Sequence, residues 1–408
     1  LADDCMTNPP SHRQIMTALI FSNVGHSFTH MFIVLYATAV LFLPKVFDLQ
    51  YGELLGLSSL GLVLYGVAAL PAGWLGDRWS QIGMITIFFY GIGIGAIWVG
   101  LAVSPESLFI GLTLIGLFAS IYHPVGIAWI VAWADKKGLT LGVNGVFGNA
   151  GGAIAPVFVG LMIDHFSWRV AFIIPGILSI LVGTLLLLFW RVGWIADVTK
   201  DRMPTSIPDS GDFVRVFAVL TITMACSGFV YSGLTNIMPK LLEMGLSAAL
   251  AGSYTEIGLF VGVISGLASL SSIFGGWMAD RYSARLIYIV FWALQIPILF
   301  AILSLSDLWL LVAILLTLSF LLTFSAAENM LVAQYTPFRW RALAYGAKFV
   351  LALGIGGLTV HLAGWSFDRD GDFSILFVFF GITALLATAT AFVLPTNLSG
   401  KVGKAGAN

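Results

Sequence analysis

Gly73-Trp74-Leu75-Gly76-Asp77-Arg78 recurs later in the chain as Gly276-Trp277-Met278-Ala279-Asp280-Arg281. The two copies lie 203 residues apart (73 to 276), and 203 is close to half of the 408 residues. Each copy stands at the end of a long apolar stretch. A match that is in register with the midpoint of the chain indicates an internal repeat, so the second half is predicted to repeat the architecture of the first.

The composition around these copies is that of a membrane protein. Hydrophobic residues make up 59% of the chain and charged residues only 10%, with a mean hydropathy of +0.98. A soluble domain carries about 25% charged residues, so this chain has too little polar surface for water. The 19 basic and 20 acidic residues nearly cancel, and we expect no nucleic-acid partner. The two cysteines do not form a disulfide framework.

Twelve apolar stretches are long enough to span a bilayer, which takes about 20 residues. Six precede a polar segment at 191–213 and six follow it, at 15–37, 53–74, 82–102, 107–131, 139–162, 170–190, 214–237, 252–279, 285–305, 308–334, 342–365 and 373–394. We predict an all-α membrane protein of two pseudo-symmetric six-helix bundles, residues 1–190 and 214–408. Residues 191–213 form a cytoplasmic linker, and the second bundle ends in a short cytoplasmic tail. The first residues lack the pattern of a signal peptide.

Basic residues are distributed unequally between the two sides. Both termini and the loops after even-numbered spans carry fourteen Lys or Arg, whereas the loops after odd-numbered spans carry four, at Lys45, Arg169, Lys240 and Arg369. Because cytoplasmic loops are enriched in Lys and Arg, we expect both termini in the cytoplasm and the chain in the inner (plasma) membrane. Asp164 and Glu256 then lie near the outer ends of spans five and eight, as solvated charges.

The repeat resembles the signature of the major facilitator superfamily of secondary transporters, and the resemblance covers essentially the whole chain. Gly73, Leu75, Asp77 and Arg78 match its first half, but the segment at 79–83 lacks its following basic residues. A second hallmark, Trp-Arg-x-x-Phe, is present at 168–172. The resemblance implies a conformational gate at the inner face, formed by Gly73, Asp77, Arg78, Asp280 and Arg281. The alternative is a loop whose charges only set the orientation.

Span five carries a stripe of small or bending residues, one every four positions, at Gly148, Gly152, Pro156 and Gly160. Such a stripe permits close helix packing and bending. It resembles the span-five signature of exporters in this superfamily, although Ala153 rather than Pro follows Gly152. Gly25-His26 with Tyr122-His123-Pro124 is similar to the fosmidomycin-resistance branch of drug exporters, and this similarity favours that branch.

Polar residues inside the spans are the candidate transport site, because they are costly in a membrane. Span one has Asn23, His26 and His30, with the histidines four apart on one helical face. Span four has Tyr122 and His123, span ten has Glu328 and Asn329, and span eleven has Lys348. The resemblance implies that spans one, four, seven and ten line a central cavity. These eight residues are the predicted substrate and proton-coupling set, with Asn144 and Asn149 among further hydrogen-bonding candidates.

Two assignments stay open within this set. Glu328 or a histidine exchanges protons during transport, or Glu328 pairs with Lys348 as a structural ion pair. His26 and His30 bind substrate or protons, or form only hydrogen bonds between helices. No third ligand is evident beside them, so no metal site is predicted, and no cofactor.

We therefore expect a monomeric secondary transporter, not an enzyme, since no catalytic motif or soluble catalytic domain is present. Its partners are a small-molecule substrate, a proton or Na⁺ as coupling ion, and the lipid bilayer. Proton-coupled export of a small organic compound by alternating access is the first expectation, with anions as one candidate class. Uptake of an organic anion by a symporter of the same fold is the alternative.

Overall fold

A computed structural model describes residues 11–133, 137–197, 213–247, 250, 252–279, 281–335 and 350–394. Within these residues the regular secondary structure is entirely helical. The first half consists of α1 (His12–Ala39), α2 (Pro44–Phe47), α3 (Tyr51–Gly56), α4 (Ser59–Val67), α5 (Ala69–Arg78), α6 (Gln81–Gly100), α7 (Pro105–Ala119), the π-helix η1 (Tyr122–Gly126), α8 (Ile127–Trp133), α9 (Lys137–His165) and α10 (Val170–Arg191). The second half consists of α11 (Phe213–Gly245), α12 (Tyr254–Ala279), α13 (Ala284–Ala301), η2 (Ile302–Ser304), α14 (Asp307–Tyr335), α16 (Gly356–Asp370) and α17 (Ser374–Ala391).

Eleven helices of the described chain are long and apolar enough to cross a membrane, and the bent second span brings the number to twelve. The predicted all-helical, twelve-span fold is confirmed. Span two differs from a single rod: α3 and α4 meet α5 at an angle of 41°. Pro71 lies in the first turn of α5 and cannot donate a backbone hydrogen bond to the turn before it, which accounts for the bend.

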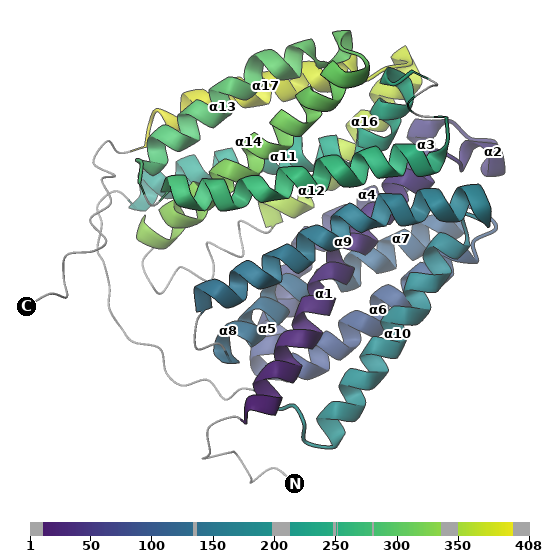
Figure 1. Cartoon of the computed structure of the whole chain (residues 1–408), viewed down its shortest axis with the longest axis vertical. Coiled ribbons are helices and arrows are strands. Elements are labelled where there is room, and N and C mark those ends of the chain that lie inside the picture. The colour runs from purple at the N-terminus through teal and green to yellow at the C-terminus, as the bar shows by residue number, and fades with distance from the viewer. Residues whose placement is uncertain are drawn as a thin grey trace, which may run out of the picture.

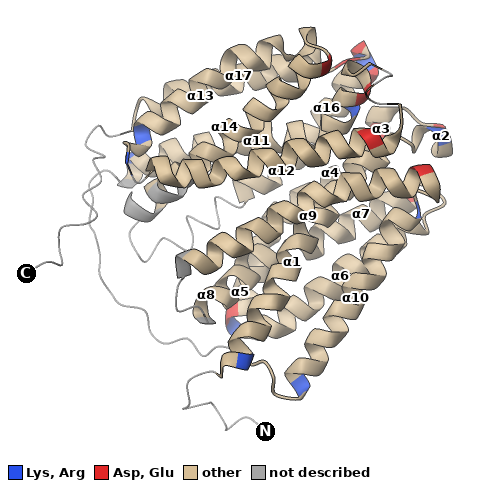
Figure 2. Ribbon diagram, viewed as in Figure 1, with Lys and Arg blue, Asp and Glu red and all other residues tan. Residues whose placement is uncertain are grey.

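Helices of one half lie together on one side of the molecule, and helices of the other half lie opposite (Figure 1). The charged residues shown in colour gather toward the helix ends, and the middle of each helix is almost free of them (Figure 2). On α10, Leu181, Leu185 and Leu188 are about half exposed, as expected for a face that contacts lipid.

The most extensive contacts between the halves form two seams, α9 against α12, and α3 and α4 against α16, and α1 also contacts α11. Small residues allow these approaches: a Cβ on Gly262 would collide with the carbonyl oxygen of Ala153, and one on Gly364 with that of Gly52. At the other ends of α9 and α12, a Cβ on Gly142, Gly145 or Gly276 would have no atom within 4 Å. The seam is therefore tight at one end and open at the other, as the divergence of α9 and α12 in Figure 1 also shows.

Candidate functional site

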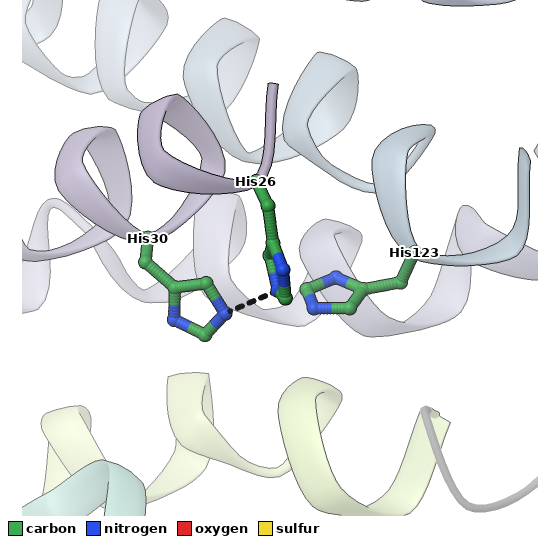
Figure 3. A group of neighbouring side chains, drawn as sticks. All are labelled: His26, His30 and His123. Carbon is green, nitrogen blue, oxygen red and sulfur yellow. Dashed lines mark hydrogen bonds between the residues drawn. The ribbon is translucent and has the colours of Figure 1, made fainter. Parts of the chain in front are cut away.

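Three histidines gather inside the first half. His26 and His30 lie one turn apart on α1, and His123 comes from η1. One ring nitrogen from each lies within 4.8 Å of the others, and Figure 3 shows the three rings directed toward one another. His26 and His123 are each 8% exposed. We call these three residues the histidine cluster.

Hydrogen bonds fix the ring of His26. Its Nδ1 lies 2.8 Å from the backbone carbonyl oxygen of Asn144 on α9. A carbonyl oxygen only accepts, so we assign the proton to Nδ1, which leaves a lone pair on Nε2 of the neutral ring. The Nε2 of His30 lies 3.1 Å from that atom and, by the same reasoning, donates to it. The two rings therefore form a directed chain from His30 to Asn144.

His123 is presented by an irregular turn. The residue after it, Pro124, has no backbone N–H, and the helix widens into a π-turn at 122–126. Such single π-turns are frequent at functional sites. The Nδ1 of His123 lies 3.2 Å from the hydroxyl of Tyr65 on α4. The ring of His123 is thus tied to span two as well as to span one.

Tyr122 links the cluster to its surroundings. Its hydroxyl donates to the backbone carbonyl of Ser22 at 2.8 Å and accepts from the side-chain amide of Asn144 at 2.9 Å. The same amide donates to Asn23 at 2.9 Å, and the ring of Tyr122 stacks on His26 with centroids 5.0 Å apart. Asn23 therefore has a positioning contact within the network.

A cavity lies between the halves, next to the cluster. It has about 640 Å³ of unfilled space, open solvent at its mouth included. His30 is the member of the histidine cluster that lines it. Polar side chains from both halves complete the lining, at Thr38, Asn149, Tyr231, Thr235, Ser265 and Ser269. The described lining contains no Lys, Arg, Asp or Glu.

The span-five stripe is distributed over three environments. A Cβ on Gly148 would lie 2.7 Å from the ring of His26, and Gly152 and Pro156 line the cavity. Gly160 packs against the backbone of Tyr254 at the start of α12. One face of α9 thus makes room for His26, borders the cavity and contacts the other half.

Glu328 is the predicted substrate and proton-coupling residue of the second half whose side chain the structure describes, and it does not join the histidine cluster. Glu328 is 2% exposed and accepts a hydrogen bond of 2.6 Å from the hydroxyl of Tyr288 on α13. It is absent from the described cavity lining, where α14 contributes Leu318 and Leu322. The side chain of Asn329 and all of Lys348 lie outside the described residues, so the proposed ion pair of Glu328 with Lys348 stays a prediction.

The signature glycines pack against the span that carries His123. A Cβ on Gly73 would lie 3.0 Å from Pro124, and one on Gly76 would lie 2.7 Å from Val125. The guanidinium of Arg78 lies over the Trp74 ring at 4.4 Å. In the second half, Arg281 lies over Trp277 at 4.6 Å, whereas Asp280 lies outside the described residues. The gate role of Asp77 and Asp280 remains a prediction.

Several residues that line the cavity were not predicted from the sequence. Tyr231 and Thr235 stand four apart on α11, and Ser265 and Ser269 stand four apart on α12. This spacing places each pair on one helical face and could have identified them. Tyr65 has no such signal, because its contact with His123 depends on how spans two and four pack.

The sequence predicts no third ligand beside His26 and His30. This prediction is wrong, because the fold brings His123 next to them. Three neutral imidazoles, with no carboxylate or thiolate in the described group, would leave the two charges of a metal ion uncompensated inside the membrane. That no metal binds remains a prediction.

Comparison with known proteins agrees with this architecture. The sequence pattern of the Major Facilitator Superfamily matches residues 20–359. The probable nitrate/nitrite antiporter NarK1 of Thermus thermophilus is 30% identical over 290 residues, 67% of this chain and 63% of that protein. The glycerol-3-phosphate transporter of Bacillus subtilis is 31% identical over 142 residues, 32% of each chain. The chain thus aligns with less than two thirds of the length of these relatives.

Among solved structures, an inward-facing bacterial homologue of the human lysosomal transporter Spinster superposes with a TM-score of 0.75, at 15% identity, covering 94% of this chain and 97% of that one. At this identity the likeness concerns the fold alone. The pattern match over most of the sequence establishes that this chain belongs to the Major Facilitator Superfamily.

Proposed function

We propose that the chain carries a small anion and a proton together through the cavity between its halves. The observation that carries the proposal is the position of His30, which borders the cavity while its Nε2 lies 3.1 Å from Nε2 of His26. One side chain is thereby in reach of both a substrate and the histidine cluster.

The hydrogen bonds indicate where an added proton would reside. In the neutral chain, His30 donates through Nε2 to His26, which in turn donates through Nδ1 to Asn144. The remaining lone pair of His30 is on Nδ1, so a proton binds there without breaking either bond. His30 is then a cation at the cavity wall, and imidazole changes charge in the physiological pH range.

The surroundings favour this cation as the anion site. The titratable groups facing the His26–His30 pair are His123 and Tyr122 from η1, with Tyr65 of α4 behind His123 and Tyr231 of α11 across the cavity. None of these supplies a permanent positive charge. The described lining contains no Lys or Arg, so among the described residues a protonated His30 would supply the positive charge for an anion.

The relatives support an anionic substrate class. One is named for nitrate and nitrite and the other for glycerol 3-phosphate. Both names describe proteins that this chain matches over only part of their length, so they support the class and leave the particular anion to experiment.

Shared use of His30 bears on the direction of transport. If the anion binds to the protonated ring, proton and anion cross the membrane together, which is the uptake symport given above as the alternative. The span-five stripe favoured export, as did the similarity to the fosmidomycin-resistance branch. Its residues have packing contacts with His26 and α12, so the stripe is compatible with either direction.

The test is transport into proteoliposomes with nitrate, glycerol 3-phosphate and a panel of small organic acids. We expect an acidic exterior to drive accumulation, and His30→Gln to abolish the dependence on the pH gradient. Glu328→Gln is the matched control, since it also removes a buried titratable group but one bonded to Tyr288. Thermal stability in detergent verifies folding of both variants. Gradient dependence that survives in His30→Gln, or is lost in well-folded Glu328→Gln, would overturn the proposal.

A further inference from the structure

Asp164 joins the two halves at the tight end of the seam. Near the end of α9, it accepts hydrogen bonds from the backbone N–H of Thr255 at 2.7 Å and of Tyr254 at 3.4 Å. It also accepts from the hydroxyl of Thr255 at 2.6 Å. A carboxylate of the first half thus binds the start of α12 in the second half. Asp164 is exposed, as expected for a solvated charge, and it also forms this contact between the halves.

Asp368 makes the reciprocal contact. This residue of α16 belongs to the second half, and its Oδ1 accepts the backbone N–H of Gly52 at 2.7 Å. Gly52 lies at the start of span two in the first half. A Cβ at Gly52 would collide with the backbone of Gly364, so this position also requires close backbone approach.

The two contacts are related by the internal repeat. Gly52 and Thr255 are 203 residues apart, which is the offset of the signature, and Asp164 and Asp368 are 204 apart, which differs from it by one. Each helix start also has the same local sequence pattern, Tyr-x-Glu, at 51–53 and 254–256. Glu53 and Glu256 accept backbone N–H groups three residues earlier, from Gln50 at 3.0 Å and Ser253 at 3.1 Å.

Each contact is favourable for the same physical reason. The first N–H groups of a helix have no partner within the helix and carry partial positive charge, so a carboxylate binds them strongly. Lys45 adds a third link between the halves by donating to the hydroxyl of Tyr254 at 3.0 Å. This bond raises the pKa of Lys45, so the link persists over the pH range in which histidine titrates.

These contacts all lie at the end that the charge distribution assigns to the outer face. At the opposite end, positions 142, 145 and 276 have open space around them. From this we infer that Asp164 and Asp368 form a symmetric outer clasp, which holds the transporter closed outside and open inside. Both carboxylates must release their helix starts before the outer face opens. The inference rests on the alternating-access motion of the proposed function.

Distance measurements on the intact chain test the clasp without measuring transport. Spin labels at Val103→Cys and Ser304→Cys, both exposed outer positions of different halves, report the outer opening. A second pair at Arg191→Cys and Tyr282→Cys reports the inner opening. Cys5 and Cys226 are replaced by Ser throughout. For Asp164→Ala or Asp368→Ala, we expect the ratio of outer-open to outer-closed molecules to rise about tenfold, which corresponds to about 1.4 kcal/mol. The Asn variants should raise the ratio less.

Asp307→Ala is the matched control. Its carboxylate accepts the backbone N–H of Ser247 at 2.7 Å, which is the same kind of bond within one half, so the ratio should stay within about twofold of wild type. The parent chain should show two distances at each end, with the outer-open population rising as the inner-open population falls. If it does, but the double variant Asp164→Ala/Asp368→Ala leaves the outer distances unchanged, the outer clasp is refuted and alternating access is not. A parent chain with a single distance at each end, under all substrate and pH conditions, would instead contradict the proposed function.

Discussion

The two halves share a framework but differ in the chemistry of their first spans. In α1, Asn23, His26 and His30 join a polar network that includes α9 and η1. The positions 203 residues later on α11 are Cys226, Phe229 and Gly233. Phe229 packs edge-on against Phe380 at 5.5 Å, and a Cβ on Gly233 would collide with the same ring. The equivalent surface of the second half is apolar and filled.

The shared features are those that the predicted gate and the proposed outer clasp connect with movement. Arg78 lies over Trp74 as Arg281 lies over Trp277, and Asp164 and Asp368 bind opposite helix starts. A rocking motion of two halves about one axis needs matched contacts, whereas one substrate can be bound by different side chains from each half. Under the two proposals above, the symmetric residues serve the motion and the asymmetric histidines serve recognition.

The largest effect should come from the asymmetric histidine at the cavity wall. His30→Ala removes the cation that binds the anion, and we expect transport to fall by about 100-fold, within the range for loss of a proton-transfer group. The matched control is His361→Ala, an exposed histidine of the second half, which should change transport less than about twofold. Initial uptake rates in proteoliposomes measure both. Equal losses in the two variants would remove the distinction between the halves.

Crowding the histidine cluster should have the next largest effect. Gly148→Ala places a Cβ 2.7 Å from the His26 ring, so the ring must move and its hydrogen bond to Asn144 weakens. Overpacking of this kind costs about 1–3 kcal/mol, and we expect the transport rate to fall about tenfold. Gly145→Ala on the same helix meets no atom within 4 Å and should leave the rate unchanged. A normal rate for Gly148→Ala would show that the position of His26 is not critical.

Removal of the Tyr122 hydroxyl should affect stability more than transport. Tyr122→Phe leaves the backbone carbonyl of Ser22 and the amide of Asn144 without this buried partner, which should destabilise the chain by about 1–3 kcal/mol. The exposed Tyr282→Phe of the second half should change stability by less than about 0.5 kcal/mol. Thermal unfolding in detergent compares them, and indistinguishable midpoints would argue against a structural role for the network.

The smallest expected effect is a difference in transport rate between Ala substitutions in the two copies of the signature. Gly73→Ala brings a Cβ to 3.0 Å from Pro124, next to His123, whereas Gly276→Ala meets open space. We expect about a threefold loss of transport for the first, from mild overpacking, and no loss for the second. Should Gly276→Ala be the more damaging, Gly276 must pack closely in another state of the cycle.

The fold could be predicted from the sequence because its determinants are local. A run of about 20 apolar residues specifies a span wherever it occurs, and the repeated signature at 73–78 and 276–281 specifies the two halves. His26 and His30 could be paired from their spacing of four. The bend in span two was missed, because Pro71 marks it but a continuous apolar run conceals it.

The tertiary structure alone decided which polar residues meet. His123 reaches His26 and His30 because spans one and four cross at the π-turn, while Glu328, on the repeat-related span, bonds to Tyr288 instead. Asp164 and Asp368 have the sequence pattern of exposed charges, and their partners are backbone N–H groups, which every residue except proline carries. Side-chain spacing along one helix is set by the chain itself, but contacts between helices depend on packing, which no local pattern encodes.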